Sequence, residues 1–124
     1  MMKIKELTRA EEQLMQILWQ LKKGFVKDVM EVLPEPKPAY NTVSTIIRIL
    51  ETKGFAGHTA YGKSHEYHPI VSKEQYKNFA AEKLLTGYFD NSVNRMLSFF
   101  VKKEKIDLKE ADEIMKLIEK LKNK

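Results

Sequence analysis

Residues 39–54 have the sequence AYNTVSTIIRILETKG, and the spacing of apolar and polar residues in this stretch decides the fold. Apolar side chains recur every three or four residues, which predicts a helix over 40–53 with one buried face. These side chains are Val43, Ile46, Ile47 and Leu50. At about 100° per residue, the opposite face carries Asn41, Thr45, Arg48 and Thr52. We expect Gly54 to end the helix, because glycine readily takes the left-handed conformation after a helix.

The polar face of this predicted helix suits the major groove of DNA. It carries no carboxylate, and its short side chains let the helix backbone approach base pairs closely. Arg48 can bind a guanine edge or a phosphate, and Asn41 can bind an adenine edge or a phosphate. The methyl groups of Thr42 and Thr45 can pack against the methyl group of thymine. The competing interpretation is a solvated helix face that binds nothing, and the neighbouring segments favour DNA binding.

Two further helices are predicted before this one. Apolar residues at helical spacing indicate helices at about 9–22 and 26–33, with Gly24 as the break between them. Thr8 and Glu11 have the spacing of a capping box at the start of the first helix. A stiff link then leads to the third helix, because proline restricts both its own φ and the residue before it. The prolines of this link are Pro34, Pro36 and Pro38.

A β-hairpin is predicted after Gly54. Residues 55–70, FAGHTAYGKSHEYHPI, are rich in Gly, Tyr, His and Thr and indicate strands at about 55–60 and 64–69. Lys63 lies in the turn between them, where it can contact the DNA backbone or the minor groove; a turn that only aids solubility is the alternative. Three helices followed by a hairpin are the element order of a winged helix, whose second and third helices form the helix-turn-helix.

Three more helices are predicted in the last third of the chain. Their expected ranges are about 72–89, 93–103 and 108–121, and Asp90 can cap the second of them. We therefore predict a mostly α fold with a small β-hairpin wing. A winged helix-turn-helix DNA-binding domain is expected at 1–71 and a helical dimerisation domain at 72–124.

These last helices carry more apolar surface than a slender extension could bury by itself. The candidate interface residues are Phe89, Met96, Leu97, Phe99, Phe100, Ile114 and Ile118. One interpretation is a monomeric helical subdomain that closes on itself. The other, which we favour, is a homodimer, because major-groove readers often need two half-sites.

Composition excludes several classes of protein. The chain has 124 residues, a formal net charge of +5 and no cysteine, so disulfides, thiolate zinc sites and a cysteine nucleophile are excluded. No secretory signal is visible at the N-terminus, and no apolar run approaches the roughly 20 residues that span a bilayer. We expect a cytoplasmic protein without stable membrane association.

No catalytic, cofactor or metal site is predicted. The sequence contains no glycine-rich phosphate loop, no His-Glu-x-x-His and no carboxylate pair in an apolar setting. His58, His65 and His68 could suggest a metal, but residues 65 and 68 point to opposite faces of a strand. We therefore predict a protein that is not an enzyme and holds no cofactor.

In the order and spacing of its segments the chain resembles the penicillinase repressor (BlaI/MecI) family of winged-helix transcriptional regulators. The segments that carry the resemblance are LTRAEEQLMQILW at 7–19, FVKDVMEVL at 25–33, AYNTVSTIIRILETKGF at 39–55, GKSHEYHPIV at 62–71 and FFVKKEKIDLKEADEIMKLIEKL at 99–121. The resemblance implies a homodimer that binds a palindromic operator and represses transcription, often of antibiotic-resistance genes.

The resemblance also implies release of the DNA by proteolysis. In the family a membrane-embedded sensor metalloprotease triggers cleavage of the repressor within the dimerisation helices, typically between an asparagine and a phenylalanine. The matching stretch here makes Phe99–Phe100 the candidate bond, with Phe99 in place of the asparagine. A second departure is Arg48-Ile49, where the family often has adjacent basic residues.

The sequence therefore favours a DNA-binding repressor and leaves two alternatives. The first is a winged-helix module that binds protein instead of DNA, which would lack the steep salt dependence of DNA binding. The second is a repressor that senses a small molecule, with a pocket near Tyr76 and Tyr88, and is not regulated by cleavage.

Overall fold

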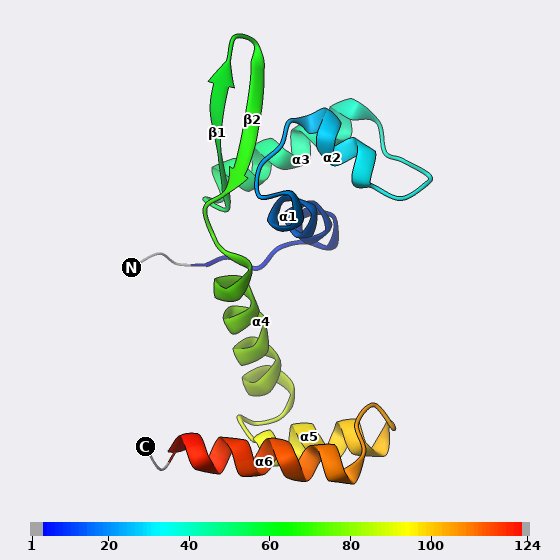
Figure 1. The fold of residues 1–124 in the computed structure, drawn as a ribbon, viewed down its shortest axis with the longest axis vertical. Coiled ribbons are helices and arrows are strands. Elements are labelled where there is room, and N and C mark those ends of the chain that lie inside the picture. The colour runs from blue at the N-terminus through cyan, green and yellow to red at the C-terminus, as the bar shows by residue number, and fades with distance from the viewer. Residues whose placement is uncertain (1–3, 123–124) are drawn as a thin grey trace. The chain divides into compact units, whose positions relative to one another are not determined.

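The computed structural model describes residues 4–122, apart from the side chains of Ile118, Leu121 and Lys122. Contacts divide the chain into two compact units, Met1–Phe79 and Ala80–Lys124, and Figure 1 shows the elements of each. The predicted fold class is confirmed, since the described elements are helices and one two-stranded antiparallel hairpin. Within the described range no helix combines the length and the apolar character that a membrane span requires.

The three helices of the first unit surround one core, as the sequence predicts. They are α1 (Arg9–Leu21), α2 (Val26–Val32) and α3 (Tyr40–Thr52). Val43, Ile47 and Leu50 of α3 are fully buried, and the predicted apolar face of this helix is thereby confirmed. They belong to the same core as Leu18 of α1 and Phe55, which follows α3. Removing each of these side chains from water contributes about 1.5–3 kcal/mol, which presses α3 against the core with its polar face outward.

α1 begins as predicted and ends differently. The Thr8 hydroxyl oxygen accepts a hydrogen bond from the Glu11 backbone N–H at 3.2 Å, and the Glu11 carboxylate accepts one from the Thr8 N–H at 2.9 Å. The predicted break is confirmed, because Gly24 lies between α1 and α2, but Lys22 is the residue that takes the positive φ, 73°, at the end of α1. Gly24 instead pairs with Tyr67, through N–H···O=C bonds of 2.9 and 2.8 Å. This bridge ties the wing to the segment between α1 and α2.

The link between α2 and α3 is held by a lysine. The Lys37 ammonium donates hydrogen bonds to the carbonyl oxygens of Met30, Glu31 and Leu33, at 2.6, 3.3 and 3.0 Å. These carbonyls lie at the end of α2, where a helix leaves acceptors without intrahelical partners and favours a positive charge. Lys37 thereby anchors the proline-rich link that leads into α3.

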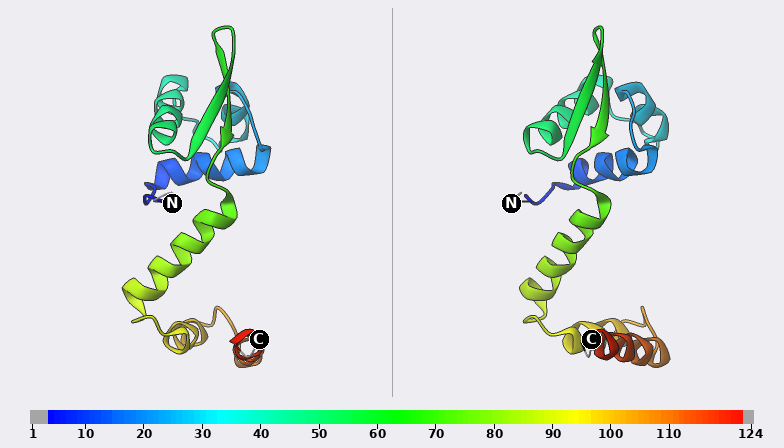
Figure 2. Two further views of the ribbon diagram at one scale, coloured as in Figure 1. Left: turned by 90° about the vertical axis from the view of Figure 1, so that its left-hand side faces the viewer. Right: turned by 60° about the vertical axis from the view of Figure 1, so that its left-hand side comes forward.

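The predicted wing is confirmed as a hairpin of β1 (Ala56–Tyr61) and β2 (Ser64–Pro69). Tyr61 pairs with Ser64, so the turn is Gly62-Lys63, and Gly62 has a φ of 63°. Glycine at the first central position is the pattern of a type II′ turn, whose twist matches that of the two strands. Figure 2 shows the hairpin extending away from the helices of its own unit, with the turn at its far end.

The last three helices are α4 (Lys73–Tyr88), α5 (Val93–Lys102) and α6 (Leu108–Lys122). α5 and α6 lie side by side in both views of Figure 2. The predicted cap at Asp90 is wrong: Ser92 is the N-cap of α5, and its hydroxyl accepts from the Arg95 N–H at 3.2 Å. Asp90 has positive φ and forms an ion pair with the Arg95 guanidinium instead.

The division between the two compact units lies within α4, not before it. Tyr76 at the start of α4 is buried in the first unit, 5.6 Å from Phe55 and 6.1 Å from Trp19 between ring centroids. Its hydroxyl oxygen accepts a hydrogen bond from the Leu7 N–H at 3.0 Å. Tyr76 is therefore a core residue, while Tyr88 at the end of α4 is 80% exposed. The roles predicted for residues 1–71 and 72–124 stay predictions.

Glu11 links the capping box to the end of α3. Lys53 Nζ lies 2.7 Å from Glu11 Oε1, and the Glu11 side chain is 8% exposed. Burial raises the pKa of the Glu11 carboxyl, but hydrogen bonds from Lys53 and Thr8 outweigh it and hold the pKa below its ordinary value of 4.5. A carboxyl with a lowered pKa in the folded state stabilises the fold above its unfolded pKa. That contribution is lost as the pH falls through the folded-state value.

Replacing Glu11 with glutamine is expected to lower the free energy of unfolding of the first unit by about 1–3 kcal/mol at neutral pH. The difference between wild type and variant should shrink below pH 4.5, where the wild-type carboxyl becomes protonated. Urea denaturation at a series of pH values measures both effects. Glu12→Gln, which removes a half-buried carboxylate from the same turn, is the control and should stay within about 0.5 kcal/mol of wild type. An equal loss in both variants would contradict the role of the Glu11–Lys53 pair.

Candidate nucleic-acid interface

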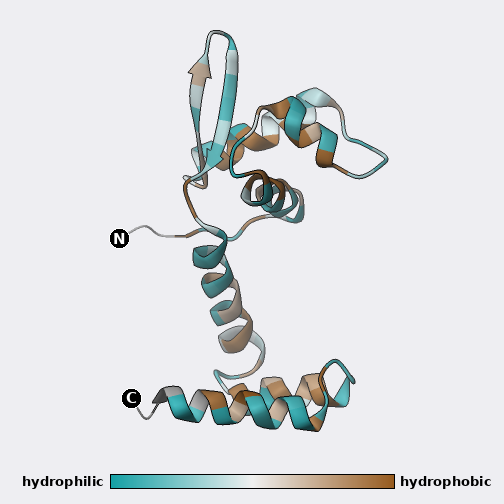
Figure 3. Ribbon diagram, in the orientation of Figure 1, coloured by the Kyte–Doolittle hydropathy of each residue, from teal (hydrophilic) through white to brown (hydrophobic). Residues whose placement is uncertain are grey.

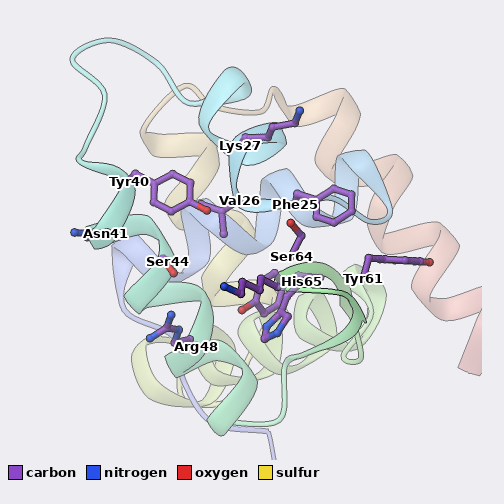
Figure 4. Close-up of a pocket in the computed structure, with 12 residues that line it drawn as sticks. Phe25, Val26, Lys27, Tyr40, Asn41, Ser44, Arg48, Tyr61, Ser64 and His65 are labelled. Carbon is purple, nitrogen blue, oxygen red and sulfur yellow. The ribbon is translucent and has the colours of Figure 1, made fainter.

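A groove of about 580 Å³ lies among α3, the start of α2 and the wing. In Figure 4, Tyr40, Asn41, Ser44 and Arg48 follow one another along α3, across from residues at the start of α2. The complete lining is Phe25, Val26, Lys27, Tyr40, Asn41, Ser44, Arg48, Tyr61, Lys63, Ser64, His65 and Tyr67. The helix-turn-helix and the wing therefore form one concave surface.

The lining of the groove is cationic. Lys27, Arg48 and Lys63 come from three different elements, α2, α3 and the turn of the wing. No carboxylate is among the lining residues. Aromatic rings and hydroxyl groups supply the rest of the polar surface. A concave surface with several cations and no anion attracts a polyanion, because the charges act together on a strand of phosphates.

Three of the five predicted DNA-binding residues line this groove: Asn41, Arg48 and Lys63. Thr42 and Thr45 are exposed on α3 but lie outside the lining. The Thr45 hydroxyl donates to the Asn41 carbonyl oxygen at 2.8 Å, so its proton is already used by the helix backbone. Thr45 therefore offers its methyl group and an acceptor, whereas Arg48 and Asn41 offer donors.

Sequence reasoning missed several lining residues. Lys27 faces the groove because α2 packs beside α3, a tertiary relation that no spacing within α2 reveals. Ser44 follows the polar face of α3 at the border with the buried face, and it is only half-buried. The sequence singles out His65 only as a candidate metal ligand. The signal that could have found it is the hairpin register, which pairs His65 with Ala60 next to the turn.

Two charged residues of α3, Arg48 and Glu51, act on Tyr67 of the wing, which lines the groove. Tyr67 of β2 is 3% exposed. Burial raises the pKa of the Tyr67 hydroxyl and the Glu51 carboxylate raises it further, while the positive charge of Arg48 and a hydrogen bond from its side chain lower it. The net pKa lies above the ordinary value of 10.0, so the hydroxyl keeps its proton at neutral pH. Glu51 itself is bound by His58 of β1, with 2.5 Å between Oε2 and Nδ1.

Two of the three histidines of the wing, His58 and His65, form a ring stack. The rings of His58 and His65 are 4.1 Å apart between centroids and nearly parallel, at 7°. His68 pairs with Gly57 and so belongs to the other face of the hairpin. Among the residues that the structure describes, no group of three His, Cys, Asp or Glu side chains could hold a metal ion.

The second unit exposes apolar side chains. Of the predicted interface residues, Phe99 is 44% exposed, Leu97 is buried within its own chain, and Phe89, Met96, Phe100 and Ile114 are half-buried. The side chain of Ile118 lies outside the described ones. Phe89, Phe99 and Phe100 contact one another, with ring centroids 5.6 to 6.4 Å apart.

Figure 3 shows hydrophobic residues along both α5 and α6. Leu108 and Leu117 of α6 are 75% and 58% exposed. Exposed apolar side chains of this size favour association.

Comparisons with known proteins point to the same family along nearly the whole chain. The sequence matches the family model described as "Penicillinase repressor" over residues 7–120. The "Penicillinase repressor" of Bacillus licheniformis is 22% identical over 125 residues, which cover 100% of this chain and 98% of the relative. The "Methicillin resistance regulatory protein MecI" of Staphylococcus aureus (strain N315) is 24% identical over 116 residues, 93% of this chain and 94% of the relative.

A solved structure resembles the fold as well. It is described as "Solution structure of the DNA binding domain of the repressor BlaI" and has a TM-score of 0.52 and 25% sequence identity. The superposition covers 61% of this chain and 94% of that one. Because the family match begins before α1 and ends within α6, and so includes both compact units, the chain belongs to the penicillinase repressor family.

Proposed function

We propose that this protein is a DNA-binding transcriptional repressor that binds a palindromic operator as a homodimer. The observation that carries the proposal is the groove among α3, α2 and the wing, which collects three cationic side chains and no carboxylate. Relatives of the chain are named as a penicillinase repressor and a methicillin resistance regulator, and the similar solved structure is a DNA-binding domain. No catalytic activity and no cofactor belong to this proposal, and the protein acts in the cytoplasm.

In the proposed complex α3 lies in the major groove. Arg48 and Asn41 contact base edges or phosphates, and the methyl groups of Thr42 and Thr45 contact thymine. Lys63 contacts the DNA backbone beside α3. This assignment is supported by the exposure of all five residues in the first unit. Since Arg48 is the only charged residue on this face of α3, affinity depends on the wing and on a second subunit.

The proposed dimer forms through the second unit, and its cleavage releases DNA. Phe99 and Phe100 lie within α5, in its last two turns. A protease that cuts between them must first unwind this part of the helix, so cleavage and loss of the apolar contact surface are one event. The cleavage is attributed to a circuit with a membrane sensor metalloprotease.

Arg48→Ala tests the DNA assignment. We expect the variant to lose about 1–3 kcal/mol of operator binding, or about 5–150-fold in Kd, because a bidentate contact to a base edge is lost. The probe is a DNA duplex selected from a random pool by the wild-type protein, measured by fluorescence anisotropy against a scrambled duplex. Preference for the selected duplex should fall together with affinity.

Arg48→Lys is the matched control, since lysine keeps the charge and lacks the planar guanidinium. It should keep the salt dependence of binding while losing base preference. Unchanged affinity of Arg48→Ala for the selected duplex would refute the assignment. Binding without steep salt dependence would favour a protein-binding module instead.

A further inference from the structure

Arg48 and Glu51 are neighbours on the surface of α3. They are three residues apart, a spacing at which opposite charges on a helix attract one another. Both also act on the same group, because the pKa of the buried Tyr67 hydroxyl responds to the charge of each. Arg48 also donates a hydrogen bond to that hydroxyl, which leaves the other N–H donors of its guanidinium for DNA. A pair between them would neutralise the one cation on the exposed face of α3.

Glu51 is bound elsewhere. Its Oε2 lies 2.5 Å from Nδ1 of His58, and the two side chains are 32% and 29% exposed. Among the side-chain hydrogen bonds and ion pairs given for the described residues, Glu51 contacts His58 and no pair joins it to Arg48. The contact is made across two elements, from α3 to β1 of the wing.

The wing holds His58 in the position that this contact requires. The hairpin register pairs His58 with Tyr67, so the two side chains lie on the same face of the sheet. The His58 ring stacks on His65 at 4.1 Å and lies 5.6 Å from the Tyr67 ring. Backbone hydrogen bonds between Tyr67 and Gly24 also fix this face of the hairpin to the segment between α1 and α2.

The contact between Glu51 and His58 affects the charge of the groove. Arg48 lines it, whereas Glu51 and His58 do not, and the lining has no carboxylate. A Glu51 side chain released from His58 would lie within reach of Arg48. There it would compete with a guanine edge or a phosphate for the guanidinium and would repel the DNA backbone.

We propose that His58 is a positioning residue for DNA recognition: by binding Glu51, the wing keeps the Arg48 guanidinium available to DNA. This inference rests on the proposed function, in which Arg48 contacts the operator. The wing then has a second role besides contact with the DNA backbone, because His58 keeps Glu51 away from Arg48 of α3. The groups that face His58 in this arrangement are Glu51, His65 and Tyr67.

A cycle of two substitutions tests the inference. His58→Phe keeps an aromatic ring for the stack on His65 and removes the nitrogen that binds Glu51. We expect it to weaken binding of the selected duplex by roughly 2–5-fold, the range for an exposed ion pair. Glu51→Gln should bind as well as wild type or better. In the double variant His58→Phe/Glu51→Gln, binding should return to the level of Glu51→Gln, because no carboxylate is left to compete.

The controls separate this inference from the proposed function. His68→Phe makes the same chemical change on the other face of the wing and should leave affinity unchanged. If His58 acted only by supporting the wing, the double variant would stay as weak as His58→Phe, and the inference would be overturned. If the wild-type protein selects no duplex, or if Arg48→Ala binds as well as wild type, the proposed function fails before this cycle is measured.

Discussion

Phe99→Asp is expected to convert the proposed dimer into monomers of 14.5 kDa. Phe99 is 44% exposed in the single chain, and in the proposed dimer a partner surface would cover its exposed part. An aspartate in that place would put an unpaired charge into an apolar interface, which costs several kcal/mol. Sedimentation velocity measures the result directly. Phe99 is preferred to Phe100 for this test because Phe100 is more buried within its own chain.

Loss of the dimer should also weaken operator binding by about 10²–10⁴-fold. Two linked half-site readers bind with a high effective concentration for the second site, and monomers lose that gain. Ser92→Asp adds the same charge to the same helix, at an N-cap position where aspartate is favoured, and is expected to remain dimeric. Circular dichroism shows whether α5 and α6 stay folded in both variants. A folded Phe99→Asp protein that still sediments as a dimer would rule out this interface.

Ile47→Ala is expected to lower the free energy of unfolding of the first unit by about 2–5 kcal/mol. Ile47 lies next to Arg48 in α3 and is fully buried in the core, so its removal leaves a cavity behind α3. A small domain has about 5–15 kcal/mol of stability in total, so the loss is a large part of it. Urea denaturation gives the change.

Ile49→Ala is the matched control for this cavity. Ile49 lies on the other side of Arg48 and is 40% exposed. Its replacement should change stability by about 0.5 kcal/mol or less, since no enclosed space is created. Equal losses at positions 47 and 49 would contradict core packing as the cause, because alanine has a higher helix propensity than isoleucine and costs no helix stability at either position.

Most of the fold could be predicted because its signals are local. The apolar spacing of α3 lies within one short segment, and Gly54, with a φ of 85°, ends that helix as expected. The hairpin was predictable from the short turn that contains Gly62, although Tyr61 belongs to β1 and the turn is one residue shorter than the predicted strands imply. Each of these features depends on neighbours in the sequence and on backbone geometry that few residues can adopt.

The remaining features depend on contacts between distant segments. Lys22 carries the positive φ at the end of α1, and Gly24 forms a backbone bridge to Tyr67, which is distant in the sequence. The place of Lys27 in the groove follows from the packing of α2 beside α3. The contact between Glu51 and His58 requires β1 of the wing to pack against α3. No periodicity within a segment reports such relations, so the candidate site was predicted along α3 and only partly around it.

Trp19 gives these experiments a built-in optical reporter. It is the one tryptophan of the sequence, and its indole N–H donates to the Val71 carbonyl oxygen at 2.9 Å. Its ring lies beside Tyr76, and both residues belong to the first unit. Tryptophan emission excited at long wavelength therefore follows the unfolding of the winged helix alone. Dissociation of the other unit leaves this signal unchanged, and the loss of the fold and the loss of the dimer can be recorded separately in one sample.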